Sequence, residues 1–277
     1  MFRKILIYGF YAIYFPLSFI WRWFDKMASW RETRFWIDHI PNASFTPATY
    51  SSYAGWIVNQ GFFCALYSLY LKKPNPKIFD FGCGMGNQAP ICHHFIKNGG
   101  SFLGVDTDKT SIEAAKATHG DLPNCSFYLT KDQNPYYPQG DTTQKMNDGI
   151  DWPIAPKSQD MLISVSVFTH LQQKDAERYM DKVYEVLADD GHAIITFHIV
   201  RDYVNENETY NFTHALTPGW FTSNPSCPEK AIGVTTEAHR NLLAGRFEIL
   251  AHIEGSVTGG KHPYLQDLFV LKKVPGK

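Results

Sequence analysis

Apolar residues along this chain fall into two patterns that alternate over much of its length. Short, nearly continuous apolar runs are typical of buried parallel strands, and stretches with helical spacing follow them. The first strand, at 78–81, and the helix after it, at 88–97, show this arrangement most clearly. Further strands are predicted at 102–105, 125–129, 160–166 and 192–198. The alternation predicts an α/β fold built on a parallel sheet.

The remaining helices and the end of the chain extend this pattern. Helical spacing predicts helices at 54–71, 110–118, 176–187 and 236–243. A capping box, Thr110-Ser111-Ile112-Glu113, is expected to open the second of these, and the aromatic stripe of the first is expected in the core. The last two strand-like runs, 247–253 and 267–271, have no helical pattern between them and are expected to pair as an antiparallel hairpin.

Three glycines at alternate positions, Gly82, Gly84 and Gly86, follow the first strand. Glycine permits positive φ and lets a ligand lie against the backbone, while N–H groups at the start of the next helix favour polar or anionic groups. Asp106, at the end of the second strand, can accept hydrogen bonds from both hydroxyls of a ribose. The spacing G-x-G-x-G, with Asn87 next, lacks the glycine pattern that makes room for a pyrophosphate. A nucleoside site of another kind is therefore predicted.

Residues 80–87 together with Asp106 resemble motifs I and II of the class I S-adenosylmethionine-dependent methyltransferases. The resemblance implies a Rossmann-like seven-stranded sheet with a terminal antiparallel hairpin, and S-adenosylmethionine as cofactor. It implies that the glycine turn holds the methionine part and that the acid holds the ribose. The cofactor-binding residues that it indicates are Asp80, Gly82, Cys83, Gly84, Gly86, Asn87, Asp106, Thr107, Asp132 and Ser166.

Asp132 resembles the family's third motif, in which an acid or amide near the end of the third strand binds the adenine amino group. Lys131 or Gln133 can occupy the equivalent place. In one respect the chain departs from the family, because Asp189-Asp190-Gly191 stands where a Lys-Pro-Gly-Gly turn is usual. The departure puts only the shape of that turn in question.

Four further stretches, 123–127, 134–140, 166–171 and 264–267, resemble one bacterial subgroup of these methyltransferases, often encoded beside glycan-assembly genes. The similarity extends from about Lys77 to Lys272 and leaves out the N-terminal residues. It implies a glycan or small-molecule acceptor.

Two histidines are candidates for the catalytic base that a hydroxyl acceptor requires. His170 follows the fourth strand, where acceptors meet the cofactor in this fold, although it can equally cap or pack against the next helix. His198 ends the fifth strand at the same edge, with Asp202 close behind, and is the second candidate. His93 and His94, in the helix after the glycine turn, are expected to be structural.

Net charge and cysteine spacing argue against several classes of partner and chemistry. The formal charge is −1, with no cluster of Lys and Arg interleaved with aromatic residues, which argues against nucleic acid as a partner. The five cysteines are scattered without metal-ligand spacing, so a reduced cytoplasmic protein without a metal is expected. Nothing near Cys83 in the sequence would lower its pKa, so a catalytic role for this thiol is not expected.

The N-terminal segment has a different character. Between Lys4 and Arg22 no residue is charged, Pro16 interrupts an apolar run, and tyrosines and tryptophans of the kind found at membrane interfaces are frequent. We expect residues 5–24 to touch the cytoplasmic face of a membrane; the alternative is a helix that packs on the domain or on a second subunit. The predicted organisation is 1–26 for this segment, 27–76 for a linker, lid and helix, and 77–277 for the catalytic domain.

These observations leave three functions to compare. At the fourth strand the chain reads Ser164-Val165-Ser166-Val167-Phe168, in place of the Asn-Pro-Pro-Tyr type of motif that binds an amino group of a DNA base. Methylation of DNA base amines is therefore not expected. O-methylation of a sugar in a cell-surface glycan or its lipid-linked precursor is the leading hypothesis. A soluble small-molecule O- or N-methyltransferase is the alternative, and an inactive cofactor-binding module is a third possibility that the intact glycines and Asp106 disfavour. The oligomeric state is not predicted.

Overall fold

The computed structural model describes residues 34–35, 39, 53–131, 150–201, 210–256 and 266–276. The chain divides into two units, residues 1–40 and 41–277. In the first unit, the ring Nδ1 of His39 donates a hydrogen bond of 2.7 Å to the backbone oxygen of Phe35. The predicted N-terminal helix and the motif at 134–140 lie outside the described residues.

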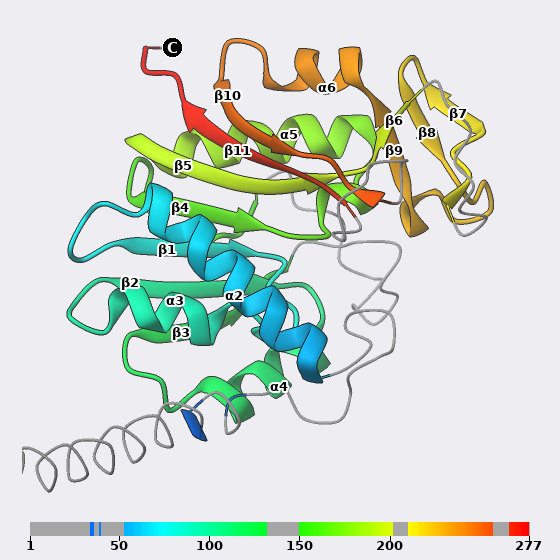
Figure 1. The fold of residues 1–277 in the computed structure, drawn as a ribbon. Helices are drawn as coiled ribbons and strands as arrows, with labels where there is room; N and C mark the ends of the chain where they lie inside the picture. Colours follow the sequence, from blue (N-terminus) through cyan, green and yellow to red (C-terminus); the bar gives the residue numbers. More distant parts are fainter. Residues whose placement is uncertain are drawn as a thin grey trace, which may run out of the picture. The chain divides into compact units, whose positions relative to one another are not determined.

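A seven-stranded sheet forms the centre of the second unit, in the order β10-β11-β5-β4-β1-β2-β3 (Figure 1). The strands are β1 Lys77–Phe81, β2 Ser101–Asp106, β3 Cys125–Leu129, β4 Gln159–Ser164, β5 Leu187–Phe197, β10 Phe247–Ile253 and β11 Asp267–Lys273. Strands β1 to β5 pair in parallel, and β11 runs antiparallel to both β5 and β10. The predicted parallel sheet and its terminal antiparallel hairpin are therefore confirmed.

Helices lie on both faces of this sheet, with α2 crossing in front of it and α5 behind it in Figure 1. They are α2 Tyr53–Tyr70, α3 Ala89–Ile96, α4 Lys109–His119, α5 Gln173–Val186 and α6 Thr236–Leu243, with short 3-10 helices η1 Phe168–His170 and η3 Pro228–Lys230. Because successive strand side chains point to opposite faces, Phe79 and Phe81 share one face of β1. There both rings contact Trp152, and Phe81 also contacts Tyr179 of α5.

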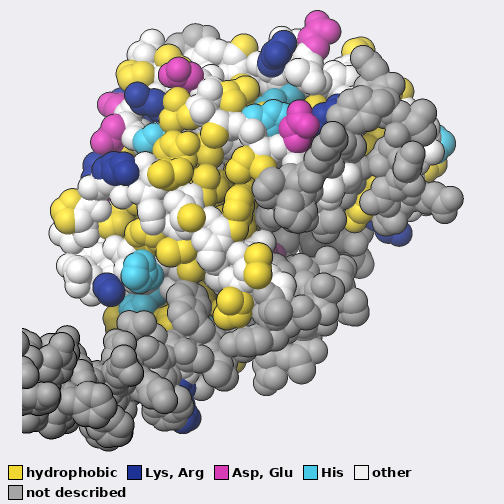
Figure 2. All heavy atoms as spheres, viewed as in Figure 1, with side chains coloured by type: hydrophobic (Ala, Val, Ile, Leu, Met, Phe, Trp, Pro, Cys, Tyr) yellow, Lys and Arg dark blue, Asp and Glu magenta, His cyan; other side chains and the backbone are white. Residues whose placement is uncertain are grey.

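Helix α2 is apolar on more than its buried side. Its inner face buries Trp56, Phe63 and Tyr67, as the aromatic stripe predicts. On its outer face Val58 and Leu69 remain 72% and 62% exposed, and Figure 2 shows hydrophobic side chains gathered on this side of the molecule. Within the described part of the chain, no helix has both the length and the hydrophobicity needed to cross a membrane.

The structure corrects two predicted element boundaries. Helix α4 begins at Lys109 instead of at the predicted capping box, because the carboxylate of Asp108 accepts hydrogen bonds from the N–H groups of Thr110 and Ser111. An aspartate at this position satisfies two N–H groups that would otherwise lack partners. Strand β5 begins at Leu187, directly after α5, and the predicted turn at 189–191 lies within an irregular part of its pairing with β4.

A second, four-stranded sheet lies between β5 and α6 in sequence and was not predicted. Its strands are β6 Ile199–Val200, β7 His214–Thr217, β8 Trp220–Thr222 and β9 Ile232–Thr235, in the order β6-β9-β8-β7. None of these strands exceeds four residues, so their side chains are too few to show a clear alternation of apolar and polar positions.

One buried carboxylate connects this small sheet to the terminal hairpin. Asp267, the fully buried first residue of β11, accepts hydrogen bonds from the backbone N–H of Ile199 and from both terminal nitrogens of Arg201. It also accepts one of 2.8 Å from the ring Nε2 of His252, on β10. A buried charge needs such partners, so the start of β11 and the beginning of the second sheet are held together.

Replacing Asp267 tests this connection. We expect Asp267→Ala to lower the free energy of unfolding by about 3–5 kcal/mol, because Arg201 would remain buried without its carboxylate partner. Asp190→Ala is the matched control. The Asp190 side chain is 70% exposed and pairs with Lys73 at the surface, so its loss should cost only about 0–1 kcal/mol. Urea unfolding followed by circular dichroism measures both; equal losses would contradict the role given to Asp267.

Candidate active site

The glycine turn follows β1 and has the backbone geometry that its sequence predicts. Gly82, Gly84 and Gly86 have φ values of 77°, 51° and 82°, which favour glycine. A Cβ at Gly82 would lie 2.1 Å from Cγ2 of Val167, so glycine is also required there by space. A Cβ at Gly84 would meet no described atom within 4 Å, so the turn is open at its centre.

Asp106 lies at the carboxyl end of β2, beside this turn. One of its carboxylate oxygens accepts a hydrogen bond of 2.8 Å from the N–H of Gly84, and the other accepts one of 2.9 Å from the N–H of Asp108. Burial raises the pKa of Asp106, while the N–H groups of Asp108, Gly84 and Thr107 oppose this shift by stabilising the charged form. The turn and the acid predicted from sequence are therefore in direct contact.

Two buried oxygen atoms close to the turn suit a polar ligand. Neither Oδ2 of Asp80, on β1, nor Oδ1 of Asn87 accepts a hydrogen bond from any described residue. Buried polar atoms are rarely left without partners in folded proteins, so such atoms beside an open turn suggest a bound group with hydrogen-bond donors. These residues fit a nucleoside cofactor that also has an ammonium group.

Helix α2 contributes to this region through polar side chains that the sequence analysis did not single out. Gln60 donates a hydrogen bond of 3.0 Å to the backbone oxygen of Asn87, and the hydroxyl of Tyr67 donates one of 2.8 Å to the side chain of Gln88. Both bonds hold the end of the turn. Helical spacing predicts a core position for Tyr67 but does not reveal the partner of its hydroxyl.

Cys83 lies inside the turn and is buried. Burial, with the carboxylates of Asp80 and Asp106 nearby, raises the pKa of its thiol well above the usual value. A thiol that stays protonated is a poor nucleophile. This environment agrees with the prediction that Cys83 fills space in the turn without taking part in the chemistry.

The segment after β4 contains Ser166 and His170. Ser166 has a positive φ of 61°, which is uncommon for a residue with a side chain. His170, in η1, donates from Nδ1 a hydrogen bond of 2.7 Å to the backbone oxygen of Glu229, in η3. Burial lowers the pKa of His170, although the backbone oxygens of Glu229 and Lys230 partly offset the effect.

His198, the second predicted base, lies directly after β5 and is buried. Its ring contacts Tyr210 and Phe212, each with centroids 5.3 Å apart. Its Nδ1 has no hydrogen-bond partner among the described residues. Burial lowers its pKa to about 3, with the charge of His170 adding to this shift and the charge of Asp267 opposing it.

Other predicted residues are placed elsewhere or not described. Asp132 and Asp202 lie outside the described residues. His93 and His94 lie in α3, and Lys131 follows β3.

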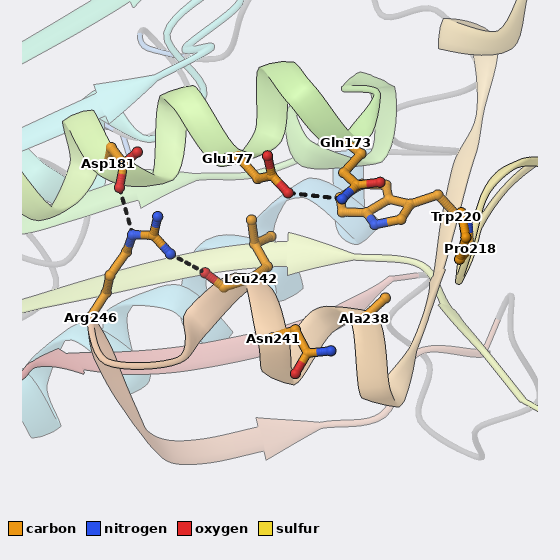
Figure 3. A pocket seen from close by; sticks show the side chains of 9 residues that line it. All are labelled: Gln173, Glu177, Asp181, Pro218, Trp220, Ala238, Asn241, Leu242 and Arg246. Atoms are coloured by element: carbon orange, nitrogen blue, oxygen red, sulfur yellow. Dashed lines mark hydrogen bonds and ion pairs between the residues drawn. The ribbon is translucent and has the colours of Figure 1, made fainter.

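A separate hollow of about 260 Å³ lies between α5 and α6 (Figure 3). It is lined by Gln173, Glu177, Asp181, Pro218, Trp220, Ala238, Asn241, Leu242 and Arg246. Several of its polar side chains bond to one another, for Gln173 donates to Glu177 and Arg246 donates to Asp181. The glycine turn, His170 and His198 contribute no residue to its lining, so this hollow is distinct from the candidate site.

The buried carboxyl of Asp80 predicts an unusual dependence of stability on pH. Burial, reinforced by Asp106, raises the pKa of Asp80 from 3.8 to about 8 in the folded chain. Between these values the unfolded chain loses the proton and the folded chain keeps it. Through this group, stability therefore falls as pH rises, by about 1.4 kcal/mol per pH unit, and levels off above pH 8.

Asp80→Asn removes this titration while keeping the shape of the neutral carboxyl. We expect its free energy of unfolding, relative to the unsubstituted chain, to increase steadily as the pH rises from about 5 to about 8. Urea unfolding across that range measures the difference. A difference that stays constant with pH would mean that Asp80 is already ionised in the folded chain.

Comparison with known proteins agrees with this geometry. Residues 79–195 match the family described as a methyltransferase domain. They run from β1 through β5 and include the glycine turn, Asp106 and the segment after β4.

Solved structures with the same fold include three at low sequence identity. The PH0226 protein from Pyrococcus horikoshii OT3 is 17% identical, with a TM-score of 0.56 over 83% of this chain and 97% of that chain. An S-adenosylmethionine-dependent methyltransferase from Mesorhizobium loti is 15% identical, with a TM-score of 0.50 over 76% and 96%. Magnesium protoporphyrin IX methyltransferase from Synechocystis PCC 6803, solved with bound SAH, is 16% identical, with a TM-score of 0.50 over 78% and 82%.

These likenesses show the class I methyltransferase fold. The matched residues include the glycine turn, Asp106 and His170, whereas α2 and His198 lie outside them. Residues 79–195 therefore match a methyltransferase domain, and the chain has the fold of the class I methyltransferases.

Proposed function

We propose that this protein transfers the methyl group of S-adenosylmethionine to a hydroxyl of a sugar, in a cell-surface glycan or its lipid-linked precursor. The observation that carries the hydroxyl acceptor is the hydrogen bond from Nδ1 of His170 to the backbone oxygen of Glu229. A backbone oxygen only accepts, so Nδ1 holds the proton and the neutral ring has its lone pair on Nε2. Such a ring can take the proton that an attacking hydroxyl must lose.

The cofactor is proposed to lie across the glycine turn. Asp106 accepts hydrogen bonds from the ribose hydroxyls, with Thr107 beside it, and Gly82, Cys83, Gly84 and Gly86 leave room for the methionine part. Asp80 and Asn87 offer their unpartnered oxygens to its polar groups. Asp132 and Ser166 complete the proposed set, on the adenine side and on the acceptor side respectively.

The bound cofactor supplies a methyl carbon on a sulfonium, which is already a good leaving group. The chain must then place the acceptor oxygen in line with that carbon and remove its proton. His170 is preferred to His198 for the second task. A pKa of about 3 makes His198 a weak base, whereas the backbone oxygens of Glu229 and Lys230 partly offset the effect of burial on the pKa of His170.

The sugar acceptor rests on two sequence observations. The stretches at 166–171 and 264–267 resemble the subgroup associated with glycan assembly, and the uncharged run at 5–24 suits contact with a membrane that holds a lipid-linked precursor. A small-molecule acceptor is the second candidate. It is favoured by the fold shared with magnesium protoporphyrin IX methyltransferase, whose name specifies a small-molecule substrate.

Cofactor binding can be tested without knowing the acceptor. We expect Asp106→Ala to weaken binding of S-adenosylhomocysteine by about 10-fold to 100-fold, because hydrogen bonds to a charged group are lost. Glu113→Ala, which removes an exposed carboxylate from α4, should leave the affinity unchanged. Isothermal titration calorimetry measures both. Unchanged binding by the Asp106 variant would contradict the proposed placement of the ribose.

The base can be tested with S-adenosylmethionine that carries a labelled methyl group, incubated with a whole lysate of the source organism. We expect His170→Ala to reduce label transfer by about 100-fold or more while the affinity for S-adenosylhomocysteine stays within twofold. His214→Ala, on the exposed edge of β7, is the matched control and should transfer at the normal rate. Normal transfer by the His170 variant would exclude it as the base.

The same incubation identifies the class of acceptor. Label in the lipid-extractable or polymeric glycan fraction supports sugar methylation. Label confined to small aqueous molecules would overturn the sugar acceptor and favour the second candidate.

A further inference from the structure

Three polar side chains at the carboxyl edge of the sheet form a closed set of hydrogen bonds. The hydroxyl of Thr196, on β5, accepts a bond of 2.8 Å from the N–H of Ser166 and donates one of 2.6 Å to Oε1 of Gln266. The amide nitrogen of Gln266 donates one of 2.7 Å to the hydroxyl oxygen of Ser166. Gln266, which directly precedes the last strand, therefore bonds both to Thr196 on β5 and to Ser166 in the loop after β4.

This set holds Ser166 in a backbone conformation that it would not readily adopt. At φ 61° a residue with a Cβ is less stable than glycine by about 1 kcal/mol. Thr196 binds the N–H of Ser166 and Gln266 binds its side chain, so both groups are fixed together. Thr196 is itself fully buried, which gives the set a rigid base.

The loop held in this way lies directly against the glycine turn. Val167, the next residue, approaches Gly82 so closely that a Cβ on that glycine would meet its Cγ2 at 2.1 Å. Three residues further on, His170 is held by the backbone oxygen of Glu229. A change in the conformation of Ser166 would therefore move the residue that covers the turn.

Gln266 is positioned by its neighbour in sequence. Asp267 is fully buried and accepts hydrogen bonds from Ile199, Arg201 and His252. The backbone that directly follows Gln266 is thus anchored to the second sheet and to β10. The side chain of Gln266 extends from this anchor past β5 to the loop after β4.

We infer that Gln266 is a positioning residue, which holds the 165–171 loop against the glycine turn and so sets the affinity of that turn for the cofactor. It acts through the backbone of Ser166 and needs no contact with the cofactor. The inference rests on the proposed function in one respect, namely that the turn binds S-adenosylmethionine and its product. The terminal hairpin is then part of the active-site support.

The test measures binding of S-adenosylhomocysteine by calorimetry and amide hydrogen exchange of the 165–171 peptide. We expect Gln266→Leu to weaken binding by about 10-fold and to speed exchange in this peptide, since both of its side-chain hydrogen bonds are lost. Gln173→Leu is the matched control, because this glutamine bonds to Glu177 and Thr217 away from the turn. It should change neither measurement.

A second pair of variants examines the hydroxyl of Thr196. Thr196→Val should weaken binding as Gln266→Leu does, and Thr196→Ser, which keeps the hydroxyl, should bind normally. Circular dichroism at the titration temperature confirms that each variant is folded, so that reduced binding is separated from loss of the fold.

A glycine background distinguishes positioning from a general loss of structure. Glycine adopts φ 61° without the help of Gln266, so adding Gln266→Leu to Ser166→Gly should weaken binding by less than about threefold relative to Ser166→Gly alone. A loss of about 10-fold in that background as well, or normal binding by Gln266→Leu alone, would overturn the inference. If the unsubstituted chain bound no S-adenosylhomocysteine, the proposed function would be wrong, and unchanged exchange in Gln266→Leu would overturn the positioning role separately.

Discussion

The sharp turn after β1 is the constraint on which the rest of the site depends. Gly82, Gly84 and Gly86 all have positive φ, and side chains crowd two of these positions, so a Cβ would require the neighbours to move. The turn brings Asp106 within hydrogen-bond distance of Gly84 and leaves an opening at its centre. Helix α2 and the loop after β4 both contact this turn.

Support comes from both ends of the domain. Helix α2 precedes the first strand and bonds to the end of the turn through Gln60 and Tyr67. The terminal hairpin follows the last helix and reaches the loop that covers the turn through Gln266. Because the strands of a parallel sheet end at one edge, segments distant in sequence meet there. A small displacement of α2 or of the terminal hairpin would therefore change the shape of the glycine turn.

Burial sets the charge of the titratable groups around this edge. It raises the pKa of Asp80 to about 8 and lowers that of His198 to about 3, so both side chains favour their neutral forms at neutral pH. Asp267 is as deeply buried but is surrounded by Arg201 and His252, which stabilise its charge. This edge of the sheet therefore combines a buried carboxylate whose charge has partners, Asp267, with two buried side chains that favour their neutral forms, Asp80 and His198.

The sequence alone determined the strands of the main sheet, the terminal hairpin and the glycine turn, because these features depend on local periodicity and on residues with special backbone freedom. The strands of the second sheet are too short to show an alternation of apolar and polar residues. The sequence also did not show that Asp108, and not Thr110, caps the first N–H groups of α4. Nothing in the sequence distinguishes Gln266 and Thr196 from other polar residues, and only the fold places both within hydrogen-bond distance of Ser166. Tertiary structure decided these contacts, because hydrogen bonds between residues far apart in sequence depend on distances that local patterns do not encode.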